Sequence, residues 1–407
     1  MIQLIRMAFR DLGRNKRRSF LSAFALSIGL ALLLLMAATI EGMLRSALDT
    51  SINLQSGHLQ LRAPDYDEDK LSLKYADLVS DPQVVADKIA GLEAVKVATP
   101  RLYASGIAIS KDKSLGVRIT GVDPDSTANA PFKDSLLSGT FLSPEDRDGV
   151  VIGKPLADKL GLQSGDKLRL LVNTTSGEVD EQDFTIRGIF STKTPSFDET
   201  TVFLSLVKAQ AITRTENYAS IIFILLKNID QTDEVAAALQ TGLQVKTYKQ
   251  LNELLTQFNS LSGGYMVFLY LIVLSITATV IVNALVMAVF ERTREIGILS
   301  AIGMKSWRIM FMFFAESSIL AIGGILMGLV LGMLIISYTT ANGLPIDYSK
   351  MGVDGFLIGE KIYTFLTLRD TLNLSITAFI VTLLGALYPA LLAAQMEPVE
   401  ALHGAGQ

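Results

Sequence analysis

Four long apolar segments constrain the fold of this 407-residue chain more than any other feature. A helix needs about 20 mostly apolar residues to cross the hydrocarbon core of a bilayer. The segments at 19–41, 265–290, 309–337 and 372–392 meet this requirement, and residues 42–264 separate the first from the second. Inside lipid every backbone polar group needs an internal partner, which favours helices. The sequence therefore predicts a membrane protein with four transmembrane helices in a 1+3 arrangement.

Basic side chains beside these segments orient the chain. Residues 1–18 and the loop at 291–308 carry a net positive charge, whereas the loop at 338–371 is slightly acidic. Because basic residues next to a span mark the cytoplasmic side, both termini and residues 291–308, which are expected to form a short charged helix, lie inside the cell in this prediction. Residues 42–264 and 338–371 are then extracytoplasmic, and the tail at 393–407 is cytoplasmic. The amphipathic residues 1–18 predict a helix in the inner interface.

The segment 42–264 is long enough to form a domain with its own core. Short β-rich runs alternate with helical patterns, and both flanks read as helices continuous with the neighbouring spans. The sequence thus predicts an α+β extracytoplasmic domain inserted between the first and second spans on helical stalks. The runs predict strands at Gly57–Arg62, Val117–Gly121, Lys167–Val172, Phe184–Ile189 and Ser220–Leu226, helices at Lys154–Leu160, Ser205–Ile212 and Asp233–Leu239, and stalks at Glu41–Leu48 and Tyr248–Phe258.

Composition excludes several kinds of chemistry. The chain contains no cysteine and only His58 and His403, so thiolate sites and histidine-rich metal sites are excluded. Gly149–Pro155 has three residues between its glycines and a proline where a phosphate-binding loop needs serine or threonine. The extracytoplasmic segment shows no nucleophile–base constellation. We therefore expect no catalytic residue, no metal site, no bound cofactor and no nucleic-acid partner in this chain.

The third span contains a repeat of small residues and one acidic residue. Gly324, Gly328 and Gly332 recur every four residues, and small residues on one helical stripe permit close approach of a neighbouring helix. Glu316 lies about two turns into the same span, where a structural hydrogen bond is favoured over a proton relay. The basic cluster Arg14–Arg18 is expected chiefly to set topology, with binding of anionic lipid as the alternative.

The most specific motif is Glu291-Arg-Thr-Arg-Glu-Ile-Gly-Ile-Leu-Ser-Ala-Ile-Gly-Met-Lys-Ser, between the second and third spans. It resembles the coupling loop of the MacB/LolC (FtsX-like) family of ABC-transporter permeases. The stretch from Gly385 to Leu402 is similar to the ending of that family, and Val150–Leu168 resembles its extracytoplasmic domain. The resemblance covers essentially the whole chain, although the fused ATPase of MacB is missing from it.

The resemblance implies a permease subunit of the bacterial inner membrane that is not itself an enzyme. Two cytoplasmic ATPase subunits would bind the ATP and magnesium, and a second permease copy or a paralogue would complete the assembly. The ATPases are expected to contact Glu291, Arg292, Arg294, Glu295 and Gly297. Closure of the ATPases would then move the extracytoplasmic domain, which is called mechanotransmission.

Three functions follow from the resemblance. The leading one is extraction or transport of lipoproteins or other amphiphiles, with the possibility of a periplasmic acceptor or adaptor. The alternatives are peptide or drug efflux with a periplasmic partner, and an FtsX-like scaffold that activates a cell-wall hydrolase. For the leading function we predict a lipid-accessible cavity, because methionine and aromatic side chains repack around varied acyl chains. Its candidate residues are Met36, Ile40, Met43, Phe268, Leu271 and Ile272.

Overall fold

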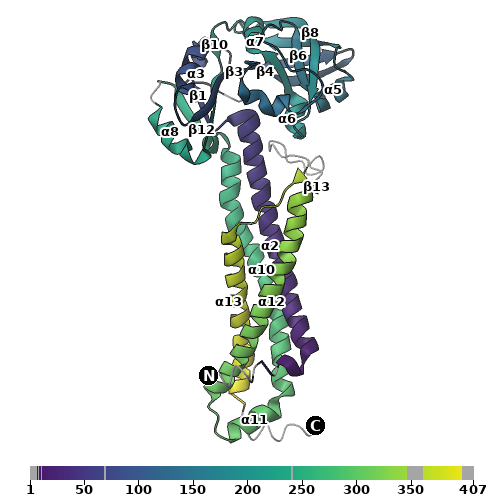
Figure 1. Cartoon of the computed structure of the whole chain (residues 1–407), viewed down its shortest axis with the longest axis vertical. Coiled ribbons are helices and arrows are strands. Elements are labelled where there is room, and N and C mark those ends of the chain that lie inside the picture. The colour runs from purple at the N-terminus through teal and green to yellow at the C-terminus, as the bar shows by residue number, and fades with distance from the viewer. Residues whose placement is uncertain are drawn as a thin grey trace. The chain divides into compact units, whose positions relative to one another are not determined.

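The chain forms two compact units, a helical bundle and an α+β domain, which Figure 1 shows with their labelled elements. The bundle comprises residues 1–43, 259–344 and 362–407, and the domain comprises residues 44–258 and 345–361. The computed structural model describes residues 7, 9–10, 12–67, 70–239, 242–345 and 361–396. The predicted N-terminal helix and extracytoplasmic loop lie partly, and the C-terminal tail mostly, outside the described residues.

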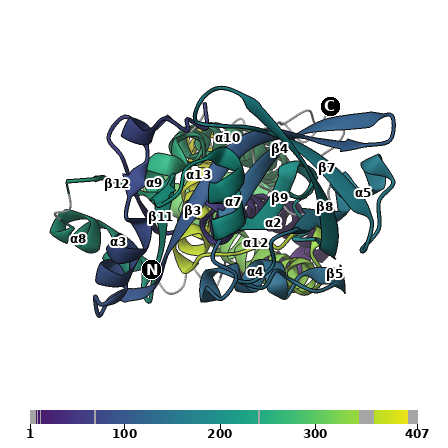
Figure 2. The same cartoon turned by 90° about the horizontal axis from the view of Figure 1, so that it is seen from above.

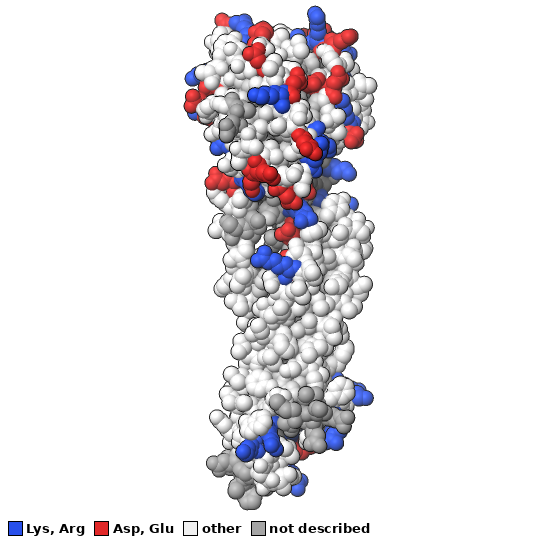
Figure 3. All heavy atoms as spheres, turned by 60° about the vertical axis from the view of Figure 1, so that its left-hand side comes forward, with Lys and Arg blue, Asp and Glu red and all other residues white. Residues whose placement is uncertain are grey.

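Four helices among the described residues are long and apolar enough to cross a membrane. Figure 3 shows that, on the face in view, the middle of these helices carries almost no acidic or basic side chains. Their order along the chain confirms the predicted 1+3 arrangement around an inserted domain. They are α2 (Lys16–Ser51), α10 (Glu253–Glu291), α12 (Ser306–Asn342) and α13 (Leu368–Ala394), and the short helix α11 (Thr293–Ala301) lies between α10 and α12.

The bundle core consists of aliphatic side chains from all four long helices. Leucines dominate on α2, and alanines on α13 allow its backbone to approach the other helices closely. Because lipid is as apolar as these side chains, packing rather than the hydrophobic effect holds the helices together. The buried core includes Leu26, Leu30, Leu33, Leu34, Leu274, Ile281, Leu285, Leu320, Ile325, Leu374, Ala378 and Ala386.

A short segment before α13 closes one end of the bundle. It follows β14 (Lys361–Ile362), which pairs with β13 (Leu344–Pro345). Phe365 donates its backbone N–H to the carbonyl of Ala38 at 2.8 Å, and Thr364 shares hydrogen bonds with the hydroxyls of Thr339 and Thr340. A Cβ on Gly42 would lie 2.0 Å from the carbonyl oxygen of Tyr363, so only glycine fits there.

The domain is built on a ten-stranded mixed sheet in the order β12-β1-β11-β3-β4-β9-β6-β8-β5, with β7 paired to β3 and β8. Its central strand is β3 (Val95–Ser110), which pairs antiparallel with β11, β4 and β7. The other strands are β1 (Leu59–Arg62), β4 (Lys113–Val122), β5 (Leu136–Gly139), β6 (Gly149–Gly153), β7 (Lys167–Asn173), β8 (Val179–Phe190), β9 (Thr201–Ser205), β11 (Ile221–Leu226) and β12 (Gln244–Thr247), while β2 (Val79–Ser80) and β10 (Tyr218–Ala219) form a separate pair.

Short helices cover the two ends of this sheet, as Figure 2 shows from above. One end carries α3 (Pro82–Ala90) and α8 (Thr232–Ala238), and the other carries α5 (Lys154–Leu160). Separate hydrophobic clusters fill these two lobes, and another cluster, rich in phenylalanine, packs on strands β4, β6, β8 and β9. The remaining helices are α4 (Ala130–Lys133), α6 (Pro195–Thr200), α7 (Leu206–Thr213) and α9 (Tyr248–Leu251).

The predicted strands and helices of the domain are confirmed, with boundaries that shift by a few residues. The prediction for Lys154–Leu160 coincides with α5, which ends at Gly161 in the left-handed conformation. The sequence did not reveal β3, because Pro100 and Gly106 interrupt its alternation of apolar and polar residues. Along the first stalk, α2 continues into a π-helical turn at Ile52–Ser56 before the chain enters β1.

Candidate functional site

The short helix α11 lies between the second and third membrane helices. Helix α10 ends at Glu291 because Arg292 leaves helical geometry, with φ −111° and ψ 13°. At the other end, Gly303 adopts a φ of +90° and donates its N–H to the carbonyl of Ser300, while Met304 donates to Leu299. A glycine with positive φ is the usual residue just beyond a helix C-terminus. The result is a two-turn helix with a fixed break at each end.

One face of α11 packs against the bundle. Ile296 is 1% exposed and belongs to a hydrophobic cluster with residues of α10, α12 and α13. Gly297 is buried beside it. The cluster contains Val289, Ile296, Ile309, Met312, Phe313, Ala390 and Ala393. Because its members come from three long helices, a displacement of α11 must also displace the ends of those helices.

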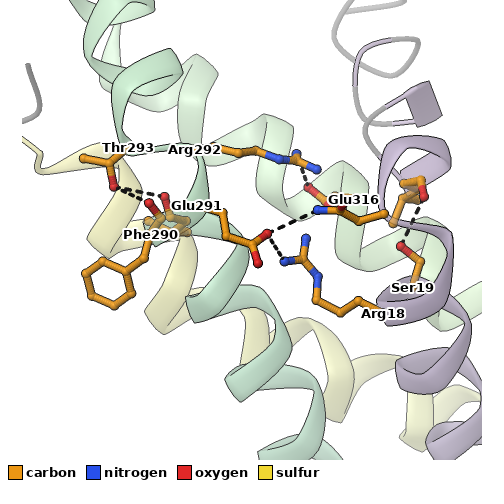
Figure 4. A network of polar contacts seen from close by, with 10 residues as sticks. Arg18, Ser19, Phe290, Glu291, Arg292, Thr293 and Glu316 are labelled. Carbon is orange, nitrogen blue, oxygen red and sulfur yellow. Dashed lines mark hydrogen bonds and ion pairs between the residues drawn. The ribbon is translucent and has the colours of Figure 1, made fainter. Parts of the chain in front are cut away.

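A buried ion pair fixes the junction between α10 and α11. Nη1 of Arg292 donates to Oε2 of Glu316 at 3.4 Å, and the two side chains are 2% and 3% exposed (Figure 4). Burying two charges carries a large desolvation cost that only close pairing offsets. Glu316 thus makes the structural hydrogen bond predicted from the sequence. The side chain of Arg292, by contrast, points into the bundle and not toward a docking partner.

The basic segment before α2 contacts the same junction. Arg18 Nη1 donates to Oε2 of Glu291 at 2.5 Å (Figure 4). Asn15 Nδ2 donates to the same oxygen at 3.2 Å. Arg14 pairs with Glu295 at 2.8 Å on the exposed side of α11. Two basic residues four apart therefore face two acidic residues four apart. That matched spacing was visible in the sequence, but nothing local indicated that the two segments meet.

Several residues around α11 remain exposed to solvent. Arg294 is exposed, Ile298 is 48% exposed and Ile302 is 75% exposed. Trp307, at the start of α12, is 49% exposed. Of the five residues predicted to contact an ATPase, Glu291, Arg294 and Glu295 present exposed side chains, whereas Arg292 and Gly297 are buried. The helix thus presents a mixed charged and apolar surface on a rigid support.

The glycine stripe of α12 faces α2. A Cβ on Gly324 would lie 2.8 Å from Cδ2 of Leu26, and one on Gly328 would lie 2.9 Å from the carbonyl oxygen of Ser27. At Gly332 the nearest atom would be Cδ1 of Leu34 at 3.0 Å. Such distances are shorter than ordinary van der Waals contacts, so the close approach of these two helices depends on the absence of side chains.

The six residues predicted to line a lipid-accessible cavity all lie in the bundle unit. Those on α2 (Met36, Ile40, Met43) are half-buried, and those on α10 (Phe268, Leu271, Ile272) are 41–61% exposed. Their exposure is compatible with contact to lipid or to a second protein, so the cavity stays a prediction. Among the described residues, no group of three or more histidine or acidic side chains could hold a metal ion.

Comparison with known proteins decides the family. Residues 19–241 match the MacB-like periplasmic core domain, which by itself covers more than half of the chain, and residues 267–398 match the FtsX-like permease C-terminal domain. The chain belongs to the MacB/FtsX-like family of ABC-transporter permeases. Members of this family are permease subunits that act with cytoplasmic ABC ATPases. With four apolar helices and a domain of the periplasmic type, this permease is an inner-membrane protein.

Individual relatives of this permease are distant. It is 24% identical over 288 residues to an uncharacterized ABC transporter permease of Methanocaldococcus jannaschii, with 67% of each chain covered. It is 24% identical over 285 residues to the lipoprotein-releasing system transmembrane protein LolC of Xylella fastidiosa, with 66% of each chain covered. The macrolide export ATP-binding/permease protein MacB of Bdellovibrio bacteriovorus is 24% identical over 437 residues, which cover 99% of this permease and 62% of that protein.

Proposed function

We propose that this permease couples ATP hydrolysis by a separate cytoplasmic ATPase to movement of its extracytoplasmic domain, in order to extract or transport lipoproteins or other amphiphiles. The observation that carries the proposal is α11, a short helix with an exposed charged and apolar face. A hydrophobic cluster packs α11 against the bundle, Glu295 pairs with Arg14, and the ion pairs of Glu291 and Arg292 fix the junction between α10 and α11. Because α11 is held firmly against the bundle, a force that an ATPase applies to its exposed face would move α10 and α12 instead of bending α11.

The proposal places α11 and both termini in the cytoplasm. Arg14, Arg18, Arg294, Lys305 and Arg308 all lie near the end of the bundle that carries α11, and basic residues beside spans favour the cytoplasmic side. Two ATPase subunits would bind there, each on one copy of this permease or on a paralogue. The ATP and magnesium would belong to those ATPases.

The lipoprotein or amphiphile substrate rests on the relatives named as LolC, and drug or peptide efflux is a second candidate. The second candidate is favoured by coverage, because the MacB relatives match 98–99% of this permease whereas the LolC relatives match 66–76%. Under the first candidate, photo-crosslinkers at Ile40 and Leu271 should capture an acylated substrate. Capture of bulk phospholipid alone there, with substrate captured only by the domain, would contradict the cavity.

Reversing both charges on the exposed face of α11 tests the coupling. In full-length permease co-expressed with its ATPase, the double variant Arg294→Glu/Glu295→Lys should lose ATP-dependent transport while membrane insertion stays unchanged. The Glu295 change also breaks the pair with Arg14, so Arg14→Ala serves as the matched control and should retain transport. Unchanged transport in the double variant would refute the assignment of α11 as the ATPase contact.

A further inference from the structure

An arginine in the domain is buried without a carboxylate. Arg101 on β3 is 1% exposed and pairs with no acidic residue in the described part of the chain. Its Nη1 donates to the backbone carbonyl of Leu54 at 3.0 Å, while Nε and Nη2 have no hydrogen-bond partner among the described residues. Its Cζ lies 3.6 Å from the centroid of the Phe223 ring. Its Cζ also lies 6.0 Å from the centroid of Phe132, and the side chain of Tyr103 interacts with it. Because arginine stays charged in proteins, this is a buried cation held by one carbonyl and by neighbouring aromatic side chains.

The carbonyl that receives this cation belongs to the end of the first stalk. Leu54 lies in the π-helical turn Ile52–Ser56, which completes a continuous helix from Lys16 to Ser56. The last carbonyls of a helix have no partner within it and carry the negative end of the helix dipole. A cation at this position is stabilised by both effects. The guanidinium therefore caps the helix that comes directly from the membrane.

On its other side, Arg101 belongs to the centre of the sheet. Its backbone pairs with Ile221 of β11 on one edge and with Val122 of β4 on the other. The side chain of Leu54 is buried in the phenylalanine cluster that contains Phe132, Phe190 and Phe203. The end of the first stalk is thus joined to the strand that is hydrogen-bonded to both halves of the sheet.

The second stalk reaches the domain differently. Between α9 and α10 the chain leaves helical geometry at Asn252, with φ −111° and ψ 47°. The side chain of Asn252 accepts a hydrogen bond from Ser51 Oγ at 2.5 Å and donates to Ser56 Oγ at 3.4 Å. These contacts tie the second stalk to the first beside the break. A break in the helical backbone is a place where the direction of a helix can change.

We propose that Arg101 is the positioning residue that fixes the end of the first stalk to the central strand of the domain, while the second stalk pivots at Asn252. A displacement of α2 would then be transmitted to β3 and would move both ends of the sheet together. The inference deepens the proposed function, because it rests on the domain being moved by the membrane helices. It names the residue through which that movement passes.

Hydrogen–deuterium exchange of the full-length permease in lipid nanodiscs tests the anchor without any ATPase. In Arg101→Met, amides of residues 52–57 should exchange at least about tenfold faster, since a lost charge-assisted hydrogen bond is worth that much or more. Amides of β6 and β8 should be unchanged. The matched control is Arg118→Met, because Arg118 also lies over an aromatic ring, 5.8 Å from Tyr103, on the adjacent strand β4. It should leave residues 52–57 unchanged.

Arg101→Lys keeps the proposal testable if the methionine variant unfolds. Unfolding would appear as faster exchange in β6 and β8, and the lysine variant, which retains the charge but not the guanidinium fork, would then decide. If the variant that folds exchanges its amides at residues 52–57 at the wild-type rate, Arg101 does not anchor the first stalk.

A second arm separates the anchor from the proposed function. In the complex with the co-purified ATPase, the nucleotide-dependent change in exchange along β3 should fall at least about fivefold in Arg101→Met, while basal ATP hydrolysis stays within about twofold. Faster exchange at residues 52–57 with an unchanged nucleotide response of β3 would overturn the transmitting role of Arg101. Absence of any nucleotide response in the wild-type complex would instead count against the proposed function.

Discussion

The bundle and the domain each bury one arginine almost completely, and they stabilise it in opposite ways. Arg292 is 2% exposed and pairs with the carboxylate of Glu316 on α12. Arg101 is 1% exposed and relies on the carbonyl of Leu54 and the ring of Phe223. Arg292 is stabilised by a full opposite charge inside the low-dielectric interior. Arg101 is stabilised only by the partial charges of a backbone carbonyl and of neighbouring aromatic rings.

This difference determines what a single substitution leaves behind. Removing Glu316 leaves a buried guanidinium deprived of its carboxylate, whereas removing Arg101 leaves only a neutral carbonyl. A buried charge that loses its partner destabilises the fold more than a buried carbonyl that loses its partner, because the desolvation penalty is largest for a full charge. The junction beside α11 should therefore be less tolerant of single changes than the anchor at the first stalk.

The largest effect is expected at the ion pair. Glu316→Leu should destabilise the permease by about 3–5 kcal/mol, the usual cost of breaking a buried pair from one side. The double variant Arg292→Met/Glu316→Leu should regain most of that loss, because it removes both charges. Thermal unfolding of the full-length protein in detergent measures both. A double variant that is no more stable than the single one would contradict the argument.

The next largest effect concerns pH and a third buried charge, Asp198 in α6. Its carboxylate accepts hydrogen bonds from the N–H and hydroxyl of Thr192 at 2.9 and 2.6 Å, yet burial raises its pKa to about 6. Since the folded pKa lies above the unfolded one, the protonated form favours folding. The contribution of Asp198 is thus fully present below about pH 4 and is lost as the pH rises to about 6, on the order of 3 kcal/mol.

Chemical denaturation of wild type and Asp198→Asn between pH 4.5 and 7.5 checks this sign. The difference in unfolding free energy should change across this range and level off above about pH 6. Burial lowers the pKa of His58, which gives that residue a pH dependence of opposite sign. The difference between the two proteins cancels the histidine contribution. A constant difference would show that Asp198 titrates normally.

A smaller loss is expected at the anchor. Arg101→Met should cost about 1–3 kcal/mol, the range for leaving one buried carbonyl unsatisfied. Denaturation of the full-length protein at neutral pH gives this value directly. A loss as large as that of Glu316→Leu would mean that the cation makes a larger contribution to stability than its single hydrogen bond indicates, and the contrast between the two arginines would fail.

The smallest effect belongs to the exposed pair between Arg14 and Glu295, whose side chains are 58% and 50% exposed. Exposed pairs contribute about 0–1 kcal/mol and are screened by salt. Arg14→Ala should therefore shift the unfolding free energy by less than about 1 kcal/mol, and the shift should shrink when the ionic strength is raised. A larger shift that persists in high salt would show that the basic segment contributes more than this contact.

The sequence predicted what depends on local pattern. Apolar length defined the spans, and helix-ending glycines such as Gly161 defined the short helices of the domain. The central strand β3 was missed although it forms a hairpin with the next strand, β4, because Pro100 and Gly106 interrupt its alternation of apolar and polar residues; its other partners, β7 and β11, lie farther along the chain. Two-residue periodicity alone cannot detect such a strand when proline and glycine interrupt it.

The sequence predicted where a short helix lies between the second and third spans, but not which way its side chains point, and the contact of this helix with an ATPase stays a prediction. The motif at 291–297 pointed to α11, and the exposed side chains of Arg294 and Glu295 fit that expectation. Arg292 was included with them, although it turns inward to Glu316. The break at Arg292 sets this direction, and helical spacing through the motif gives no sign of it. The pairing of Arg14 and Arg18 with Glu295 and Glu291 likewise depends on segments about 270 residues apart.

The contact between the glycines of α12 and the face of α2 also has a consequence for the order of synthesis. Ser27 and Gly328, which meet there, are separated by about 300 residues of chain. At about 5–20 residues per second, a ribosome needs about 15–60 s to make that intervening chain. During this time α2 must remain in the bilayer without its neighbour, and the domain must begin to fold while it hangs from a single helix. Residues 19–40 of the first span carry no charged side chain, which makes this helix stable alone in lipid, and this property is therefore needed during synthesis as much as in the finished fold.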